Sequence, residues 1–307
     1  MPQKTILLAG GSGFVGQQLT NYFADKGYTL HILTRTQDPS KLNRDNLRFF
    51  YWNPQKRIID KGAFKDVNTI FNLSGANIGE KRWTEDRKRE IVDSRITSTR
   101  LLFETVKDNQ LKVEKIVSSS AIGYYGMLTS KEIFQESSPA GNDFLANVCI
   151  AWENEALKFQ EIGTKVIILR KGVIIGNGGV YARLAPLAKL GINTSLGSGK
   201  QFMPWIDISD LTRLYEFILA HPEVEGVYNA VSDEYLTMKK FAHDLAKSVN
   251  KPILTPAAPA FLIRIILGEM ADMLLCGSRV SNEKLKNTGF QFQYPEIHES
   301  FNDLSNK

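Results

Sequence analysis

Short apolar runs alternate with amphipathic stretches through the first half of the chain. The apolar runs are rich in β-branched and aromatic residues and carry few charges: TILLAG, TLHILT, LRFFYW, TIFNLSG, KIVSSSA and TKVIILR. Helical periodicity separates most of them, over residues 13–26, 84–108 and 143–160. Strands that are apolar throughout are buried on both faces, as in parallel sheets whose crossovers are helices. The pattern therefore predicts an α/β fold with a doubly wound, parallel, Rossmann-type sheet.

The pattern changes after Arg170. The glycine-containing loops KGVIIGNGG and SLGSGKQFMPW follow, and then three further helical stretches. We predict a Rossmann core over residues 1–170, completed by elements within 205–232, and a smaller, mainly helical cap over residues 171–307. Ligands of open α/β sheets bind at the carboxyl ends of the strands, so we expect the cap on the substrate side of that edge.

Composition narrows the classes of function. Apolar residues make up 43% of the chain and charged residues 23%, which is typical of a globular protein. The net charge of +5 is small and the two signs are interleaved, so we expect no nucleic-acid partner. Cys149 and Cys276, the two cysteines, are too few and too far apart for a disulfide framework, and no metal site is expected.

One late segment, residues 259–276, is strongly apolar but is interrupted by Arg264, Glu269 and Asp272. It is also shorter than the ~20 apolar residues of a membrane span. We expect a buried helix there, or a helix against a partner or ligand, and no membrane association. The amino terminus runs straight into a strand without a charged-then-apolar leader, which predicts a cytoplasmic protein. Both a monomer and a homodimer remain open.

The stretch LLAGGSGFVGQQL places Gly10, Gly13 and Gly16 between a strand and an amphipathic helix. Such a turn needs a residue with positive φ, a close approach of backbone to pyrophosphate, and tight packing of the helix on its strand. The start of the helix then offers unpaired N–H groups and a partial positive charge to the phosphates. We predict a dinucleotide site formed by these glycines with Phe14 and Val15.

The end of the second strand indicates which dinucleotide. NAD sites usually place a carboxylate there for the ribose hydroxyls, whereas this chain has Thr34 and Arg35. A guanidinium would pair with the 2′-phosphate of NADP, and such a bond favours NADP(H) about ten- to hundredfold. The alternative is a solvated loop arginine.

Several motifs together resemble one family. The glycine spacing, NLSGA after the fourth strand and SSSAIGYYG after the fifth are similar to extended short-chain dehydrogenases and nucleotide-sugar epimerases. With VCIAWENEA, GSGKQFMPWIDISDL and PAFLIRIILGEMADMLL, the chain more specifically resembles the atypical epimerase-family proteins of the YfcH-like subgroup, which carry a characteristic C-terminal domain. The resemblance implies an NADP-binding Rossmann protein in which Leu73, Ser74 and Gly75 also contact the cofactor.

The resemblance also shows what is missing. Ser120 matches the serine that binds the substrate oxygen in extended relatives, and a Tyr-x-x-x-Lys pair should follow near Asn147 and Ala151. No tyrosine or lysine lies between Phe144 and Leu157, so the usual general acid/base is absent.

Four side chains are candidates near the resulting gap. Arg95 stands where relatives commonly have an active-site asparagine, and it could hold a carboxylate or phosphate or orient a carbonyl. Its alternative is a surface arginine. Tyr124 and Tyr125 follow the serine run and could supply a proton or simply pack the pocket. Glu153 could act as an acid, although a solvated helical glutamate is the simpler interpretation.

The loops after the sixth strand complete the expected pocket. We place Arg170, Gln201 and Trp205 on the substrate side, while Asp207 and Asp210 are expected to cap the helix that follows them. Cys149 is interpreted as a small buried apolar group rather than a nucleophile.

Two functional hypotheses follow. The first is an NADP(H)-dependent oxidoreductase or epimerase-like enzyme on a small polar substrate, with catalytic candidates Ser120, Tyr124, Tyr125 and Arg95. The second is a non-catalytic NADP(H) sensor. Such a protein would keep the cofactor-binding motifs and lack the acid/base pair, as this sequence does.

Overall fold

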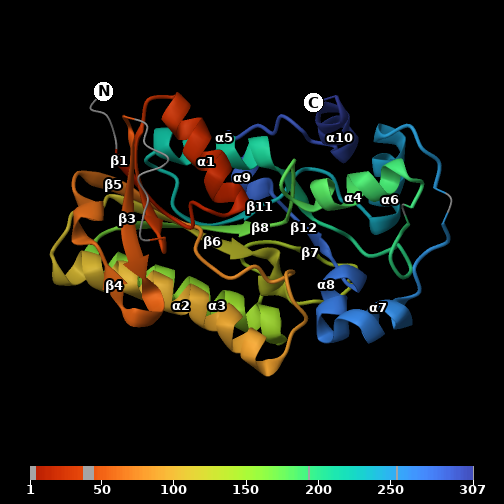
Figure 1. The fold of residues 1–307 in the computed structure, drawn as a ribbon, viewed down its shortest axis with the longest axis horizontal. Helices are drawn as coiled ribbons and strands as arrows, with labels where there is room; N and C mark the ends of the chain where they lie inside the picture. Colours follow the sequence, from red (N-terminus) through yellow and green to blue (C-terminus); the bar gives the residue numbers. More distant parts are fainter. Residues whose placement is uncertain (1–4, 37–44, 193, 254, 307) are drawn as a thin grey trace.

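The computed structural model describes residues 5–36, 45–192, 194–253 and 255–306 (Figure 1). Its central feature is an eight-stranded sheet with the strand order β11-β8-β6-β5-β1-β2-β3-β4. Each neighbouring pair is parallel except β3 and β4. The strands are β1 (Thr5–Ala9), β2 (Thr29–Thr34), β3 (Leu47–Asn53), β4 (Ile58–Ile59), β5 (Val67–Asn72), β6 (Lys115–Ala121), β8 (Lys165–Lys171) and β11 (Gly226–Ala230). The predicted α/β class with a doubly wound Rossmann-type sheet is confirmed.

Helices cover both faces of the sheet. On one face lie α1 (Phe14–Asp25) and α5 (Ile208–Ala220), and on the other α2 (Glu85–Asp108) and α3 (Phe144–Leu157), as Figure 1 shows. Alternate residues of β1 therefore enter different cores, Ile6 and Leu8 on the α1 side and Leu7 on the α2 side. Burial on both faces explains why the sequence shows apolar runs instead of alternation.

The strand order reverses between β1 and β5. From β1 the chain first builds β2 and β3 on one side, and then β5, β6 and β8 on the other. The loops after β1 and β5 consequently diverge and leave a crevice at the carboxyl ends of the strands, where open α/β sheets bind ligands.

A second, smaller packing unit begins where the chain leaves the carboxyl end of β8. The short strands β9 (Val173–Ile175) and β10 (Trp205–Asp207) pair in parallel, and α4 (Val180–Lys189), α6 (Met238–Ser248) and α10 (Ile297–Ser305) pack around them. Trp205, Phe241 and Phe301 are buried at the centre of this unit.

The remaining elements tie the C-terminal region to the core. The strand β12 (Arg279–Val280) pairs with β7 (Ile133–Phe134), which lies between β6 and α3 in the sequence. The other elements are α7 (Ala260–Leu267), α8 (Asp272–Leu275), α9 (Glu283–Lys286) and the 3-10 helices η2 (Pro54–Lys56), η3 (Lys61–Phe64), η4 (Ile122–Tyr125), η5 (Lys158–Ile162) and η6 (Gly268–Ala271).

The apolar segment that contains α7 is not buried. Phe261, Ile265 and Ile266 are 63%, 67% and 69% exposed, and Ile263 alone of its residues faces the interior. The expectation of a buried helix is therefore wrong, and a helix against a partner or ligand stays a prediction. Within the described part of the chain, no helix is both long and apolar enough to cross a membrane.

Candidate functional site

The glycine turn after β1 has the geometry of a phosphate-binding loop. Gly10 has a φ of +91°, and a Cβ there would lie 2.8 Å from the carbonyl carbon of Leu73 at the end of β5. A Cβ on Gly16 would lie 2.2 Å from the carbonyl oxygen of Gly10, so only glycine lets α1 pack this closely on the turn. Gly13 is the N-cap of α1 and has no side chain to bond the first N–H groups. Those groups remain for an anion, and a pyrophosphate fits them.

Phe14 and Val15 begin α1 beside this turn. The ring of Phe14 packs against the loop after β9, where a Cβ on Gly178 would lie 2.3 Å from the ring atom Cδ2. Val15 is partly buried against the core on the α1 face. Both side chains anchor the helix start, so their predicted cofactor contacts would come from their backbone N–H groups.

Thr34 and Arg35 lie at the same edge of the sheet. The β1–β2 register pairs Ala9 with Leu33, which puts the end of β2 level with the glycine turn. Thr34 is half-buried and its hydroxyl accepts the N–H of Thr36 at 3.2 Å, while Arg35 is exposed. Arg35 is thus free of the core at the position predicted to meet a 2′-phosphate.

The loop after β5 is held firmly against α2. The Ser74 hydroxyl is buried and lies 2.5 Å from Asn72 Oδ1 and 2.8 Å from Ser98 Oγ. A Cβ on Gly75 would lie 3.1 Å from the Arg95 side chain, so the missing side chain lets Arg95 fold across the loop. Leu73 directly adjoins Gly10.

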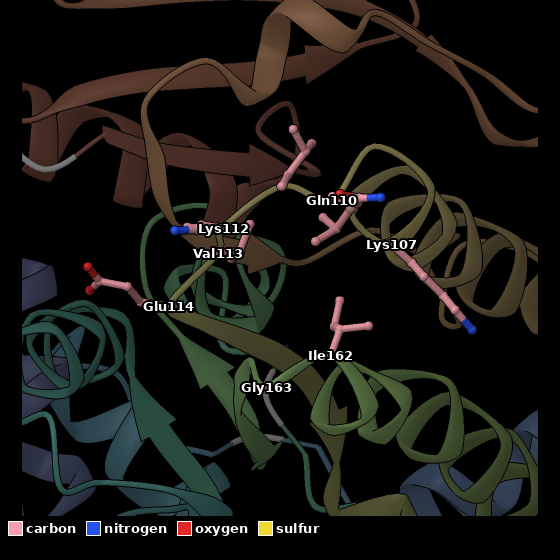
Figure 2. A pocket seen from close by; sticks show the side chains of 9 residues that line it. Lys107, Gln110, Lys112, Val113, Glu114, Ile162 and Gly163 are labelled. Carbon is pink, nitrogen blue, oxygen red and sulfur yellow. The ribbon is translucent and has the colours of Figure 1, made fainter.

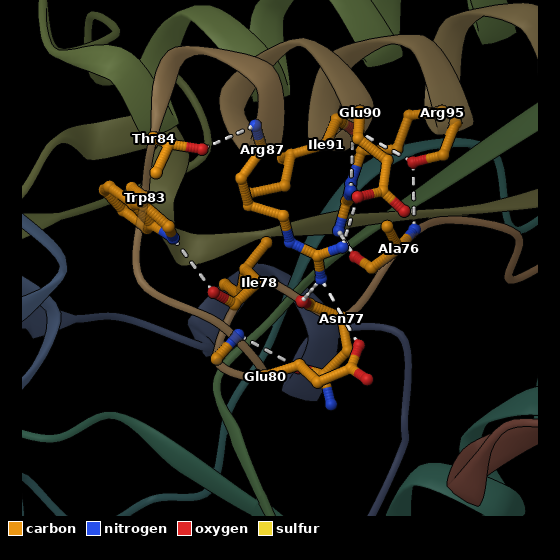
Figure 3. Close-up of polar contacts among 12 residues, drawn as sticks. Ala76, Asn77, Ile78, Glu80, Trp83, Thr84, Arg87, Glu90, Ile91 and Arg95 are labelled. Carbon is orange, nitrogen blue, oxygen red and sulfur yellow. Dashed lines mark hydrogen bonds and ion pairs between the residues drawn. The ribbon is translucent and has the colours of Figure 1, made fainter.

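The rest of this loop is fastened by arginines of α2 (Figure 3). Arg87 donates to the carbonyl of Asn77 and to Glu90, and Arg95 Nη2 donates to the carbonyl of Ala76 at 3.1 Å. Trp83 Nε1 donates to the carbonyl of Ile78 at 2.9 Å. The loop is therefore a rigid wall beside the crevice.

Ser120 belongs to a buried ionic network. Its hydroxyl donates to Glu153 Oε1 at 2.5 Å. Arg170 also donates to this carboxylate, from Nε to Oε1 at 2.9 Å and from Nη2 to Oε2 at 2.8 Å. Ser120, Glu153 and Arg170 are 2%, 6% and 3% exposed. The interpretation of Glu153 as a solvated helical residue is wrong, because α3 turns it inward onto β6 and β8. Burial would lower the pKa of Arg170, but the bonds and charge of Glu153 outweigh it and raise that pKa.

Both tyrosines of η4 contact this network. The guanidinium carbon of Arg170 lies 3.3 Å from the ring centroid of Tyr124, and its Nη1 donates to the Tyr125 hydroxyl at 3.1 Å. The Tyr125 hydroxyl donates to Asn229 Oδ1 on β11 at 2.7 Å. Burial raises the pKa of Tyr125 to about 12, against the opposing effect of Arg170, so it is a poor proton donor near neutral pH.

A cavity of about 270 Å³ opens at the carboxyl ends of β6 and β8. Its walls come from the loop after β5, from η4, α3 and β9, and from α8 to β12 in the C-terminal region. The lining is mainly apolar and aromatic, including Ile78, Met127, Phe134, Leu145, Val148, Trp152, Val173, Phe202, Met203, Met273 and Val280. Arg95 and Lys171 are the two basic residues that line it.

The face of α3 that lines this cavity lacks a proton relay. Counting from Ser120 pointed to Asn147 and Ala151, but Asn147 is exposed, and the i, i+4 pairs on the cavity wall are Leu145 with Cys149 and Val148 with Trp152. Burial, and then the charge of Glu153, raises the pKa of Cys149 to about 11. The thiol is thus a buried neutral group, as the sequence suggested.

Arg95 is a cavity residue and not a solvated surface arginine. Its guanidinium carbon lies 5.0 Å from the ring centroid of Trp152, and its Nη1 donates to the carbonyl of Ile91 at 2.8 Å. Burial lowers its pKa to about 10.

Lys171 was not among the sequence candidates. It follows Arg170 at the end of β8, and strand alternation turns it to the opposite face, where its Nζ donates to Ser119 Oγ at 2.6 Å. Burial, and then the charge of Arg95, lowers the pKa of Lys171 to about 7. A lysine directly after an arginine at a strand end was the available signal, because alternation must send one of the two toward each face.

The residues predicted on the substrate side lie deeper than expected. Gln201 is 2% exposed and its Nε2 donates to the carbonyls of Leu196 and Leu274, while Trp205 is fully buried. Neither these two nor Arg170 lines the cavity, although Phe202 and Met203 do. Their predicted substrate contacts stay predictions.

Asp207 caps α5, as the sequence suggested, by accepting the N–H of Ser209 at 2.6 Å. Asp210 lies in the first turn of α5 and accepts the N–H groups of Gln293 and Tyr294 at 2.7 and 2.9 Å. It therefore ties α5 to the segment before α10 instead of capping its own helix.

A second hollow, of about 440 Å³, lies at the opposite end of the strands (Figure 2). It is lined by the end of α2, by residues 110–114 before β6 and by Ile162 and Gly163 before β8. Ligand chemistry in this fold class occurs at the carboxyl edge, so this hollow is not a candidate site.

Comparison with known proteins agrees with this architecture. Residues 6–231 match the model of the NAD dependent epimerase/dehydratase family. The chain belongs to this family. Residues 258–304 match a second model, a domain of unknown function (DUF1731).

Relatives in this NAD(P)-binding family align over nearly the whole chain. "Epimerase family protein Mb2239" of Mycobacterium bovis is 34% identical, over 98% of this chain and 97% of its own. "Epimerase family protein SDR39U1" of Mus musculus is 30% identical, over 97% of this chain and 99% of its own. A crystal structure of human SDR39U1 with NADPH superposes with a TM-score of 0.85 at 25% identity, covering 99% of each chain. The family resemblance inferred from the motifs is thereby confirmed.

The ion pair between Glu153 and Arg170 gives a first prediction. In Arg170→Met the carboxylate stays buried without its cation, which should cost about 3–5 kcal/mol of unfolding free energy, measured by urea denaturation. The matched double variant, Arg170→Met with Glu153→Gln, removes the orphaned charge and should recover more than half of the loss. A single variant within about 1 kcal/mol of wild type would contradict a buried pair.

Lys171 gives a second prediction. Unfolded lysine titrates near ~10.4, whereas Lys171 titrates at about 7 in the fold. Between these pH values the unfolded chain binds one more proton than the folded chain, so the free energy of unfolding should rise with pH. Below about pH 7 Lys171 is charged in both states, and the full destabilisation by its charge in the fold is present. The melting temperature of wild type minus that of Lys171→Met should therefore increase from about pH 7 to about pH 10. The exposed Lys189→Met serves as control, and an equally flat difference for both variants would refute the depressed pKa.

Proposed function

We propose that this epimerase-family protein is an NADP(H)-dependent oxidoreductase that acts on a carbonyl compound. One observation carries the proposal: the glycine turn with its uncapped helix start lies at the same sheet edge as an apolar cavity that holds a lysine and an arginine. β5 separates β1 from β6, so cofactor cradle and cavity are neighbours along that edge.

The cofactor would be held by backbone and by one cation. The N–H groups at the start of α1 would bind the pyrophosphate, and the loop of Leu73, Ser74 and Gly75 would border the adjoining ribose. Arg35 would pair with the 2′-phosphate, and the presence of NADPH in the human relative supports this preference.

Lys171 is the group best suited to supply the proton. Among the titratable cavity residues, Arg95, Cys149 and Tyr125 have pKa values of about 10, 11 and 12, whereas that of Lys171 is about 7. A general acid works best when its pKa lies near the working pH. The bound cofactor would supply a hydride to the carbonyl carbon. Lys171 Nζ would give its proton to the carbonyl oxygen, the alcohol would leave, and solvent would reprotonate the amine.

The cavity also changes the expected substrate. Its lining is dominated by apolar and aromatic side chains, so we propose a substrate with an apolar body in place of the small polar molecule suggested by sequence.

A non-catalytic NADP(H) sensor is the second candidate. The observation that favours it is Leu145 and Cys149 on the face of α3 where catalytic relatives would present a proton relay. Tight NADPH binding without turnover on any carbonyl would be its signature.

Cofactor preference is tested by Arg35→Asp. We expect NADPH affinity to fall about ten- to hundredfold, with NADH affinity little changed, because the variant loses a charge-assisted bond only NADPH makes. Calorimetric titration of both cofactors measures this, with Arg57→Asp, an exposed arginine elsewhere, as control. Equal losses of affinity for NADPH and NADH would contradict the assignment of Arg35 to the 2′-phosphate.

Turnover is tested by following NADPH oxidation with a panel of apolar aldehydes, ketones and quinones. We expect Lys171→Met to lower kcat by about 10²-fold or more, the usual contribution of a positioned acid, and wild-type kcat to decline above about pH 7. NADPH affinity should persist in the variant. A larger loss of kcat in Ser120→Ala than in Lys171→Met would contradict the role of Lys171 and favour Ser120, the catalytic candidate predicted from the sequence.

A further inference from the structure

Arg95 is a cation whose contacts leave its charge uncompensated. Its two hydrogen-bond acceptors are the neutral carbonyls of Ile91 and Ala76, and its flat face rests on Trp152. Among the described residues no carboxylate lies within ion-pair distance of it, whereas Arg87 nearby pairs with Glu80 and Glu90, and Arg170 pairs with Glu153. Arg95 is half-buried, and a charge withdrawn from water without a counterion is costly.

The nearby lysine adds to this imbalance. Lys171 donates to the hydroxyl of Ser119, and its pKa is lowered mainly by burial and then by the positive charge of Arg95. The acidic residue on the cavity wall, Asp272, is already paired with Arg264 at 3.1 Å on the far, C-terminal side. The cavity thus carries excess positive charge on its sheet side.

The rest of the cavity wall is apolar and therefore suits an uncharged, apolar part of a ligand. Trp152, Phe134, Phe202 and Met273 give it aromatic and thioether walls, which bind an apolar ring or branched chain. At about 270 Å³ it holds a small molecule and not an extended one.

We propose that the substrate is a carbonyl acid: an apolar body with one carboxylate next to or near the reacting carbonyl, the carboxylate bound by Arg95. This inference deepens the proposed function and rests on it. The planar fork of a guanidinium matches a carboxylate with two parallel hydrogen bonds. With the acid group held there, the carbonyl oxygen faces Lys171, the proton source proposed above.

The packing of Arg95 makes it suitable for this recognition. Its guanidinium lies between Gly75 and the indole of Trp152 and is fixed by two carbonyls, so little side-chain entropy remains to be lost on binding. A fixed arginine also orients the bound acid, which a mobile lysine would not do.

The test compares two ligands that differ in a single group, which is charged in one of them and apolar in the other. In 2-oxo-4-phenylbutanoate a carboxylate stands where 4-phenyl-2-butanone has a methyl group. Each is titrated calorimetrically into protein saturated with NADP⁺, whose binding is measured first. We expect the acid to bind about ten- to hundredfold more tightly than the ketone, and Arg95→Met to remove most of that difference.

Two variants guard against a merely structural effect. Arg95→Lys keeps the charge but not the fork and should restore part of the preference for the acid. Arg89→Met removes an exposed arginine from the same helix and should change nothing. If NADP⁺ fails to bind wild type, the proposed function fails. If NADP⁺ binds but the acid binds no better than the ketone, or keeps its advantage in Arg95→Met, the carboxylate assignment alone is overturned.

Discussion

The buried pair of Glu153 and Arg170 is the interaction around which the candidate site is organised. It joins α3 to β8, and through Ser120 and Tyr125 it reaches β6 and η4. Tyr125 continues the network to Asn229 on β11, whose Nδ2 donates to the carbonyl of Ser281 in the C-terminal region. One network centred on this ionic contact therefore joins α3, β8, β11, the C-terminal region and the contiguous pair β6 and η4. Such a pair contributes little net stability, but removing either partner is costly, so it constrains the site more than it stabilises the fold.

The same network engages Ser120 beside a helix that carries neither tyrosine nor lysine. The serine that would bind substrate donates its hydrogen to a carboxylate, and that carboxylate is held by an arginine at two points. A proton shuttled through Ser120 would have to break a saturated, nearly dry network. The other face of β8 bears no such restriction, and Lys171 meets the cavity from there. The lysine that reaches the cavity therefore comes from the strand that follows the helix and not from the helix itself.

The sequence was sufficient for features that depend on local pattern. Apolar runs separated by helical periodicity give the sheet, and the spacing of Gly10, Gly13 and Gly16 gives the turn, because each constraint acts over a few residues. The burial of Glu153 could not be anticipated in this way. Its partner comes from another element, and a glutamate on a helix is solvated unless tertiary structure supplies a cation. The part of the cavity wall that comes from the C-terminal region could not be predicted either, because it depends on the pairing of β12 with β7, and the paired residues Ile133 and Arg279 are far apart in the sequence.

The counting of positions on α3 shows how a small error in register misplaces a site. A shift of two residues on a helix rotates a side chain by more than half a turn, which separates the exposed Asn147 from the buried Leu145 and Cys149. The absence of tyrosine and lysine between Phe144 and Leu157 could be read directly from the sequence, because it does not depend on the register of the helix. Which side chains face the cavity did depend on register, and one of them, Lys171, lies on a strand where period-two alternation turns Arg170 inward and Lys171 toward the cavity. The same alternation places Arg170 and Lys171 in different surroundings: Arg170 is paired with Glu153, whereas burial, and then the charge of Arg95, lowers the pKa of Lys171 to about 7.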